Sequence, residues 1–241
     1  MTGSAMQPDF GTMEGQDARL EALAPVLGLT LSADDRRRLL SYLGLIQRWT
    51  KVYNLTAVRD PGEMFTHHLL DCLAVIQPMR RALAAAPQPR VLDVGSGAGL
   101  PGAVLAILNP DWHVSCVDAV AKKATFIRQV AAELGLSNLQ GVHGRVEAPG
   151  TFGPQHFDLV TSRAFASLKD FTGLTRPLLA VGGQWAAMKA NLSDAERVEL
   201  PANVDMFHVE QLDVPELDAT RCLVWMKPAI DASASAPQPR Q

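Results

Sequence analysis

Short apolar runs recur along the second half of the chain, and longer segments with helical spacing separate several of them. The apolar runs predict strands over residues 90–94, 113–118, 139–144, 157–162, 184–190, 204–210 and 221–226. Amphipathic segments between them predict helices over residues 101–108, 121–134 and 168–179. This alternation predicts an α/β fold with an open, mostly parallel sheet covered by helices on both faces, closed by a final antiparallel pair. Ligands bind to such sheets at the carboxyl ends of the strands.

The chain before residue 84 has helical periodicity. Ser32 with the acidic residues that follow it is a helix-start signal, and the apolar stripe after it consists of Leu39, Leu43, Ile46 and Trp49. A second helix is expected over 63–76, with Phe65, Leu69, Leu70 and Leu73 facing inward. We therefore expect a helical extension at 18–83 and an α/β core at 84–227. The polar segment 1–17 and the Ala-, Ser- and Pro-rich segment 228–241 are expected to be disordered.

Composition and charge exclude several classes of protein. The 241 residues are 47% hydrophobic and 20% charged, with a formal net charge of −3, which is ordinary for a soluble globular protein. Three cysteines without C-x-x-C spacing indicate neither a disulfide framework nor a zinc site, and we expect no metal. Without a signal peptide or a membrane-length apolar run, the sequence predicts a cytoplasmic protein that does not contact a membrane.

Charge is nevertheless uneven along the chain. Residues 32–130 hold 12 Lys and Arg against 8 Asp and Glu, whereas residues 191–241 hold 4 against 9. A polyanionic partner should therefore meet the first half, although chance scatter of solvated charge explains the asymmetry about as well. Lys122 and Lys123 begin a predicted helix, where positive charge is unfavourable, which hints at phosphate contact; a solvated pair is the more common explanation.

The segment VLDVGSGAGLPG (91–102) contains four glycines after an apolar run, as expected of a loop pressed against a ligand. It fits the dinucleotide pattern G-x-G-x-x-G and also D-x-G-x-G-x-G, which suits S-adenosylmethionine (SAM). Asp118, 19 residues after Gly99, would bind ribose hydroxyls in either case. Asp93 favours SAM, because a carboxylate repels a pyrophosphate but attracts the SAM sulfonium and ammonium groups. Alternatively, Asp93 points away from the ligand and caps the loop backbone.

The flanking residues carry a resemblance. NLTAVRD (54–60), HHLLD (67–71), VLDVGSGAGLPG, GRVE (144–147) and SRAFASL (162–168) occur in the order found in the bacterial 16S ribosomal RNA guanine-N7 methyltransferases, also called the methyltransferase G or glucose-inhibited division protein B family. The chain resembles this family over roughly residues 39–189. The resemblance implies a Rossmann-like class I fold with seven strands, and SAM-dependent methylation of one guanine in the decoding-region loop.

The resemblance also implies site residues. It implies cofactor contacts at Gly95, Leu100, Asp118, Val146, Glu147 and Arg163, in addition to Asp93, Gly97 and Gly99, which the loop pattern itself predicts. Ser96 and Ala98 replace the Thr and Pro that are frequent in the family, and Ala190 after Lys189 replaces a frequent Gly, which makes the role of Lys189 less certain. The expected partner is 16S rRNA within the 30S subunit, with neither DNA nor a stable protein partner.

The chemistry of this reaction needs few groups. Guanine N7 carries a free lone pair and no proton, so attack on the SAM methyl group needs alignment and no general base. Arg163 or Lys189 is expected to hold guanine O6, although an ion pair that shapes the loop is an equally good account of Arg163. His68, Asp71 and Asn54 are expected to border the target base, unless they only fasten the helical extension to the sheet. A small-molecule methyltransferase, a nicotinamide-dependent oxidoreductase and a non-catalytic SAM-binding module remain alternatives.

Overall fold

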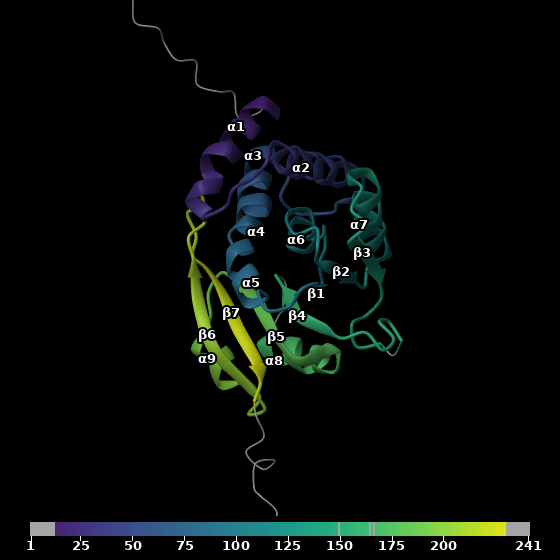
Figure 1. The fold of residues 1–241 in the computed structure, drawn as a ribbon, viewed down its shortest axis with the longest axis vertical. Helices are drawn as coiled ribbons and strands as arrows, with labels where there is room; N and C mark the ends of the chain where they lie inside the picture. The colour runs from purple at the N-terminus through teal and green to yellow at the C-terminus, as the bar shows by residue number, and fades with distance from the viewer. Residues whose placement is uncertain (1–12, 149, 164, 166, 230–241) are drawn as a thin grey trace, which may run out of the picture.

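A seven-stranded sheet forms the centre of the molecule (Figure 1). The computed structural model describes residues 13–148, 150–163, 165 and 167–229. Its strand order is β3-β2-β1-β4-β5-β7-β6, and β7 runs antiparallel to both of its neighbours while the pairs from β3 to β5 are parallel. The strands are β1 (Arg90–Val94), β2 (His113–Asp118), β3 (Leu139–His143), β4 (Phe157–Ser162), β5 (Leu179–Lys189), β6 (Val204–Leu212) and β7 (Arg221–Pro228). The predicted sheet and its closing antiparallel pair are confirmed.

Helices cover both faces of this sheet. Those of the extension are α1 (Met13–Leu23), η1 (Ala24–Leu27), α2 (Ala33–Tyr53), α3 (Pro61–Met64), the π-helical η2 (Phe65–Leu70), α4 (Asp71–Leu73) and α5 (Ile76–Ala82). Those of the α/β part are α6 (Gly102–Leu108), α7 (Ala121–Leu134), α8 (Leu168–Thr175), η3 (Arg176–Leu178) and α9 (Asp194–Val198).

Alternating residues of the central strands enter two separate cores. Val91 and Leu159 belong to the core that α2, α6 and α7 cover, whereas Leu92 and Val160 belong to the one that α8 covers. This alternation follows from the two-residue period of a strand. The extension contributes to the first core and so shares a hydrophobic interior with the sheet.

Helix α2 connects the extension to the sheet. It starts as expected at Ser32, which forms a capping box with Asp35. On its inward face, the Tyr42 hydroxyl donates a hydrogen bond to the carbonyl of Ala98 at 2.7 Å, and the carbonyl of Gly99 lies 3.1 Å away. Burial raises the pKa of Tyr42, so the phenol stays protonated and able to donate. The glycine-rich loop is therefore fastened from the side of the extension.

The structure corrects several predictions for the extension. Helix α1 begins at Met13, so the end of the segment expected to be disordered is helical; residues 1–12 and 230–241 lie outside the described part. The single helix expected over 63–76 is instead a helical run from Pro61 that widens into a π-helix over Phe65–Leu70. A wide turn of this kind leaves no signal in an apolar stripe, and it is frequent at functional sites.

The second half also differs from prediction at two places. The strand expected over 184–190 is longer: β5 starts at Leu179, includes Gly182 and Gly183, and bulges against β4. Gly182 has a φ of 79°, a left-handed conformation that suits glycine. The short helix α9, capped by Ser193, was not anticipated because it buries none of its residues and shows no apolar stripe.

We expect Tyr42→Phe to destabilise the protein by about 1–3 kcal/mol, because two buried loop carbonyls then lose their donor. Urea denaturation measures this loss. Thr50→Val is a matched control on the same helix, since the buried Thr50 hydroxyl has no hydrogen-bond partner among the described residues and its removal should cost little or stabilise. Equal losses for the two variants would show that the Tyr42 hydroxyl does not support the loop.

Candidate active site at the carboxyl ends of the strands

The glycine-rich loop leaves β1 at the carboxyl edge of the sheet. Gly95, Gly97 and Gly99 have φ values of 65°, 59° and 85°, in the left-handed region that side chains disfavour. The N–H groups of Gly95 and Ser96 both donate to the carbonyl of Val117 on β2, at 2.9 and 3.1 Å. The loop therefore follows a fixed path across the ends of two neighbouring strands.

Gly102, the fourth glycine of this segment, is required by close packing. A Cβ at this position would collide with Cys116 Sγ and with the side chain of Asp93, so helix α6 approaches the sheet closely only because Gly102 has no side chain. The Gly102 N–H donates to Asp93 Oδ2 at 2.9 Å. Asp93 is completely buried, and burial raises its pKa to about 7. Asp93 thus caps the backbone, as in the alternative account of this residue, and its contact with the cofactor stays a prediction.

Asp118 ends β2 directly beside the loop. Its carboxylate accepts hydrogen bonds from the N–H groups of Gly97, at 3.0 Å, and Val120, at 2.8 Å. Lys123 Nζ lies 3.5 Å from the same carboxylate. Each carboxylate oxygen can accept more than one hydrogen bond, so Asp118 retains capacity for ribose hydroxyls.

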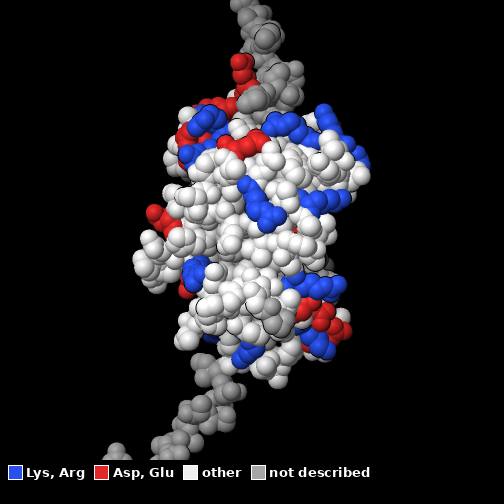
Figure 2. Space-filling view, turned by 90° about the vertical axis from the view of Figure 1, so that its right-hand side faces the viewer, with Lys and Arg blue, Asp and Glu red and all other residues white. Residues whose placement is uncertain are grey.

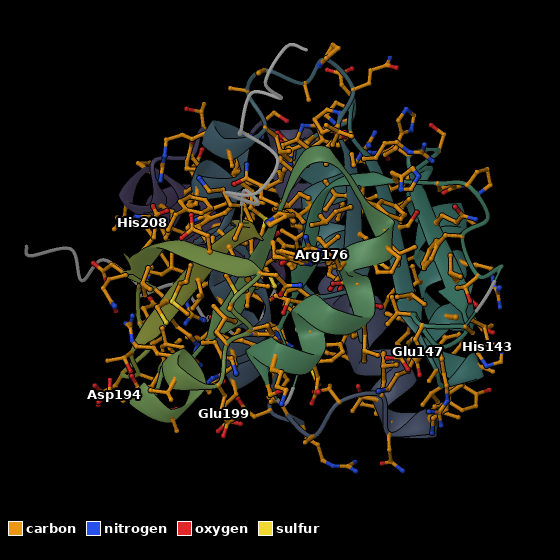
Figure 3. The ribbon with its side chains drawn as sticks, turned by 90° about the horizontal axis from the view of Figure 1, so that it is seen from below. His143, Glu147, Arg176, Asp194, Glu199 and His208 are labelled. Carbon is orange, nitrogen blue, oxygen red and sulfur yellow. The ribbon has the colours of Figure 1, made fainter. Side chains whose placement is uncertain are left out.

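The segment 144–147, which directly follows β3, lies beside Asp118. Gly144 donates to the Asp118 carbonyl at 3.2 Å, which places the segment 144–147 beside that acid. Val146 is buried, whereas Glu147 is exposed and pairs with Arg145 at 3.7 Å. Figure 3 places Glu147 near His143, the last residue of β3, on the opposite side of the molecule from Asp194 of α9. The expected adenine-side residues are therefore next to the expected ribose acid.

A cavity of about 290 Å³ opens beyond the end of β4. It is lined by Val58, His67, His68, Asp71, Arg163, Met188, Lys189, Ala190 and Arg221. The extension, the ends of β4 and β5 and the start of β7 thus all contribute to one site. Four residues expected to serve the target base, His68, Asp71, Arg163 and Lys189, line this cavity together.

Asp71 connects the cationic side chains of the cavity. Its side chain is 5% exposed and lies between Arg221 Nε, at 3.0 Å, and Arg163 Nη1, at 3.5 Å. Arg163 Nη1 also donates to the carbonyl of His67 at 3.0 Å. The ion pair that shapes the site is therefore present, and it holds Arg163 against the cavity wall.

His68 reaches the same cavity from the π-helix. Its Nε2 lies 2.9 Å from the Thr56 hydroxyl, whereas its Nδ1 is buried without a hydrogen-bond partner among the described residues. Burial, assisted by the charge of Arg163, lowers the pKa of His68 to about 4. His68 is therefore neutral at physiological pH and does not add a fourth cation.

Two other expected residues have more local roles. Lys189 ends β5 and forms an ion pair with Glu196 of α9. Asn54 is exposed at the end of α2 with a φ of 50°, and its Oδ1 accepts a hydrogen bond from Arg59 at 2.6 Å. The structure places Asn54 outside the cavity lining, although Val58 of the same loop contributes to it.

The sequence alone did not identify Arg221, Tyr42 or Thr56. Arg221 opens an apolar strand, and it reaches the site only because β7 pairs antiparallel with β5, which sets Cys222 opposite Lys189. A charged residue before an apolar run was the single available signal.

Cys116 on β2 is buried, and burial raises the pKa of its thiol, which makes it a poor nucleophile.

Fold and site together define a Rossmann-like class I methyltransferase, with a glycine loop, an acid at the end of β2 and a neighbouring cationic cavity at one edge of the sheet. The chain belongs to the rRNA small subunit methyltransferase G family, whose model matches residues 35–224. The resemblance found in the sequence is thereby confirmed.

Individual relatives agree with this assignment. The chain is 56% identical to the ribosomal RNA small subunit methyltransferase G of Leptothrix cholodnii, over 95% of this chain and all of that protein. It is also 56% identical to the enzyme of the same name from an Acidovorax species, over 85% and 92% of the two chains. Among solved structures, TrmN from Thermus thermophilus has a TM-score of 0.53 at 22% identity, covering 66% of this chain and 49% of that one. A predicted O-methyltransferase from Agrobacterium tumefaciens has a TM-score of 0.52 at 19% identity, covering 62% and 79%. At these identities the solved structures support the fold alone.

The described residues contain neither a membrane-spanning helix nor a cluster of potential metal ligands. In the part of the chain that the structure covers, no helix is both long and apolar enough to cross a membrane. The same residues contain no cluster of three His, Cys, Asp or Glu side chains arranged to hold a metal ion.

We expect Asp93→Asn to change how stability depends on pH. The Asp93 carboxyl titrates near 3.8 when unfolded and near 7 when folded, so the folded state binds the proton more tightly. Wild type should therefore lose stability as pH rises from about 4 through 7, by up to about 4 kcal/mol, whereas the variant should not. Urea denaturation of both proteins between pH 4 and pH 9 measures this, and a constant difference between them would contradict the expectation.

Proposed function

We propose that this protein transfers a methyl group from SAM to N7 of one guanine in the decoding-region loop of 16S rRNA, within the 30S subunit. The observation that carries the proposal is the cationic cavity beside the glycine loop in a chain of this family. With a ribosomal substrate, we expect the protein to act in the cytoplasm. We expect it to bind neither DNA nor a membrane, and to have no stable protein partner.

The glycine loop and its neighbours suit SAM as the cofactor. A dinucleotide would place its pyrophosphate on the N–H groups that begin the helix after the loop. Here the Gly102 N–H already bonds to the buried Asp93, so that anion site is occupied from within. SAM has no phosphate and does not need it. We assign its ribose to Asp118, its adenine to Val146 and Glu147, and its remaining contacts to Gly95, Gly97, Gly99 and Leu100.

The cavity suits a guanine whose N7 faces the methyl group. O6 lies beside N7 on the same edge of guanine and accepts hydrogen bonds. Arg163, held by Asp71 and the His67 carbonyl, has the donors for O6, and Lys189 and Arg221 line the same space. N7 has no proton to lose, so a neutral His68 is compatible with the reaction. Placement of N7, methyl carbon and sulfur in one line can contribute about 7–11 kcal/mol in favourable cases.

The deciding experiment is methylation of 30S subunits that lack the modification. The protein is incubated with these subunits and SAM labelled at the methyl group, and the label is then mapped in the RNA. We expect one labelled guanine in 16S rRNA, with the chemical reactivity of an N7-methylated base. Label in a small molecule, or no label in rRNA, would remove the proposal.

Arg163→Ala should reduce kcat about 100-fold while the Kd for SAM changes less than threefold, because Arg163 lies in the cavity and not on the glycine loop. Arg81→Ala, which removes an exposed arginine of α5, is the control and should behave like wild type. Single-turnover kinetics and calorimetric SAM titration measure the two quantities. If both stay near wild type, Arg163 has only a structural role; if both fall together, Arg163 serves the cofactor.

A further inference from the structure

An exposed tyrosine stands at the edge of the active site. Tyr53 is the last residue of α2. Its side chain is 47% exposed, although α2 buries many of its other residues. Val52, the preceding residue, and Val120, two residues before Lys122 on the segment that contacts Tyr53, are also exposed, at 69% and 40%. Apolar side chains gathered on a surface in this way mark an interaction site more often than isolated ones do.

The ring of Tyr53 is held in place. It lies 4.9 Å from the ring of Trp49, which in turn packs edge-on against Phe126 of α7 at 5.2 Å. The Tyr53 carbonyl accepts a hydrogen bond from Lys122 Nζ at 2.9 Å. A ring fixed by its neighbours can bind a second flat ring with little further loss of conformational freedom.

Three cations that pair with no described carboxylate lie on α2, on the loop after it and on α7, close to Tyr53 in sequence or in contact with it. Lys51, Arg59 and Lys122 are exposed, and within the described ranges none of them forms an ion pair with an acidic side chain. The Lys122 ammonium uses one of its three donors on Tyr53 and keeps two. Figure 2 shows the side of the molecule on which α7 and the end of α2 lie, and Lys and Arg side chains gather over its upper half.

Tyr53 is connected to both halves of the active site, through Lys122 on one side and through the loop that carries Val58 on the other. Lys122 follows the ribose acid Asp118 by four residues, at the end of β2. In the other direction, Val58 of the cavity lining is five residues from Tyr53, a span of at most about 18 Å. A nucleotide strand that delivers a base into the cavity would pass within reach of the ring.

We propose that Tyr53 is a stacking platform for an unpaired base of the RNA substrate next to the target guanine, and that Lys51, Arg59 and Lys122 bind the phosphates around that base. This proposal rests on the proposed function, because it takes the substrate to be RNA. Proteins bind unpaired bases by stacking them on aromatic side chains while basic side chains track the backbone.

The test compares three variants of Tyr53. Tyr53→Ala and Tyr53→Leu both remove the aromatic face, but leucine keeps an apolar contact with Trp49; Tyr53→Phe keeps the face and removes only the hydroxyl. We expect the alanine and leucine variants to raise KM for unmodified 30S subunits about five- to tenfold, with kcat and the Kd for SAM within twofold of wild type. The phenylalanine variant should match wild type in all three quantities.

Each other outcome would overturn the proposal. A leucine variant that behaves like wild type would mean that the ring only packs on Trp49. A phenylalanine variant as weak as alanine would assign the effect to the hydroxyl. A rise in the Kd for SAM with an unchanged KM for subunits would mean that the ring covers the cofactor.

A second measurement separates this proposal from the proposed function. Fluorescence anisotropy with a labelled 12-nucleotide single-stranded RNA reports binding without catalysis. Wild type and Tyr53→Phe should bind it at least fivefold more tightly than Tyr53→Leu, even if 30S subunits prove not to be methylated. Equal affinity of all three proteins would reject the platform while leaving the methylation assay untouched.

Discussion

The buried carboxylate of Asp71 joins the parts of the molecule that make the cavity. Asp71 belongs to the helical extension, Arg163 follows β4 and Arg221 opens β7, and the two guanidinium groups meet the same carboxylate. A buried charge is tolerable only while its partners remain, and removing one partner typically costs about 3–5 kcal/mol. The cavity therefore exists in its present form only when extension, parallel strands and antiparallel strand are all in place.

The glycine loop is fixed by a different set of contacts. Tyr42 fastens it from the extension, the Val117 carbonyl and Asp118 from β2, and Asp93 holds the start of α6 beneath it. The loop approaches its ligand with backbone already paired, so binding needs little ordering of the chain. The glycine loop, which is expected to bind the cofactor, and the cavity, which is expected to bind the target base, thus both depend on the helical extension, but through different residues.

The order of strands and helices was predictable because it rests on local periodicity. The apolar runs of β1 and β4 and the apolar stripe of α2 are visible in short stretches of sequence, and these elements form where they were expected. The π-helix, the bulge of β5 and the start of α1 were not predictable, because these features depend on packing against residues that are distant in sequence. Asp93 illustrates the same limit: its position in the loop was evident, whereas its direction was decided by Gly102 and Cys116 on other elements.

By itself, the sequence determined the class of sheet, the glycine loop, the acid at the end of β2 and the family to which the chain belongs. The first three follow from spacing within short segments, where each residue constrains its immediate neighbours, whereas the family follows from the resemblance of its motifs. The tertiary structure alone decided which charged side chains share one space. Arg221 lies 150 residues from Asp71, and their contact at 3.0 Å exists because an antiparallel strand returns beside β5. No local sequence pattern predicts this contact between Arg221 and Asp71, because it depends on the order of the strands in the whole sheet.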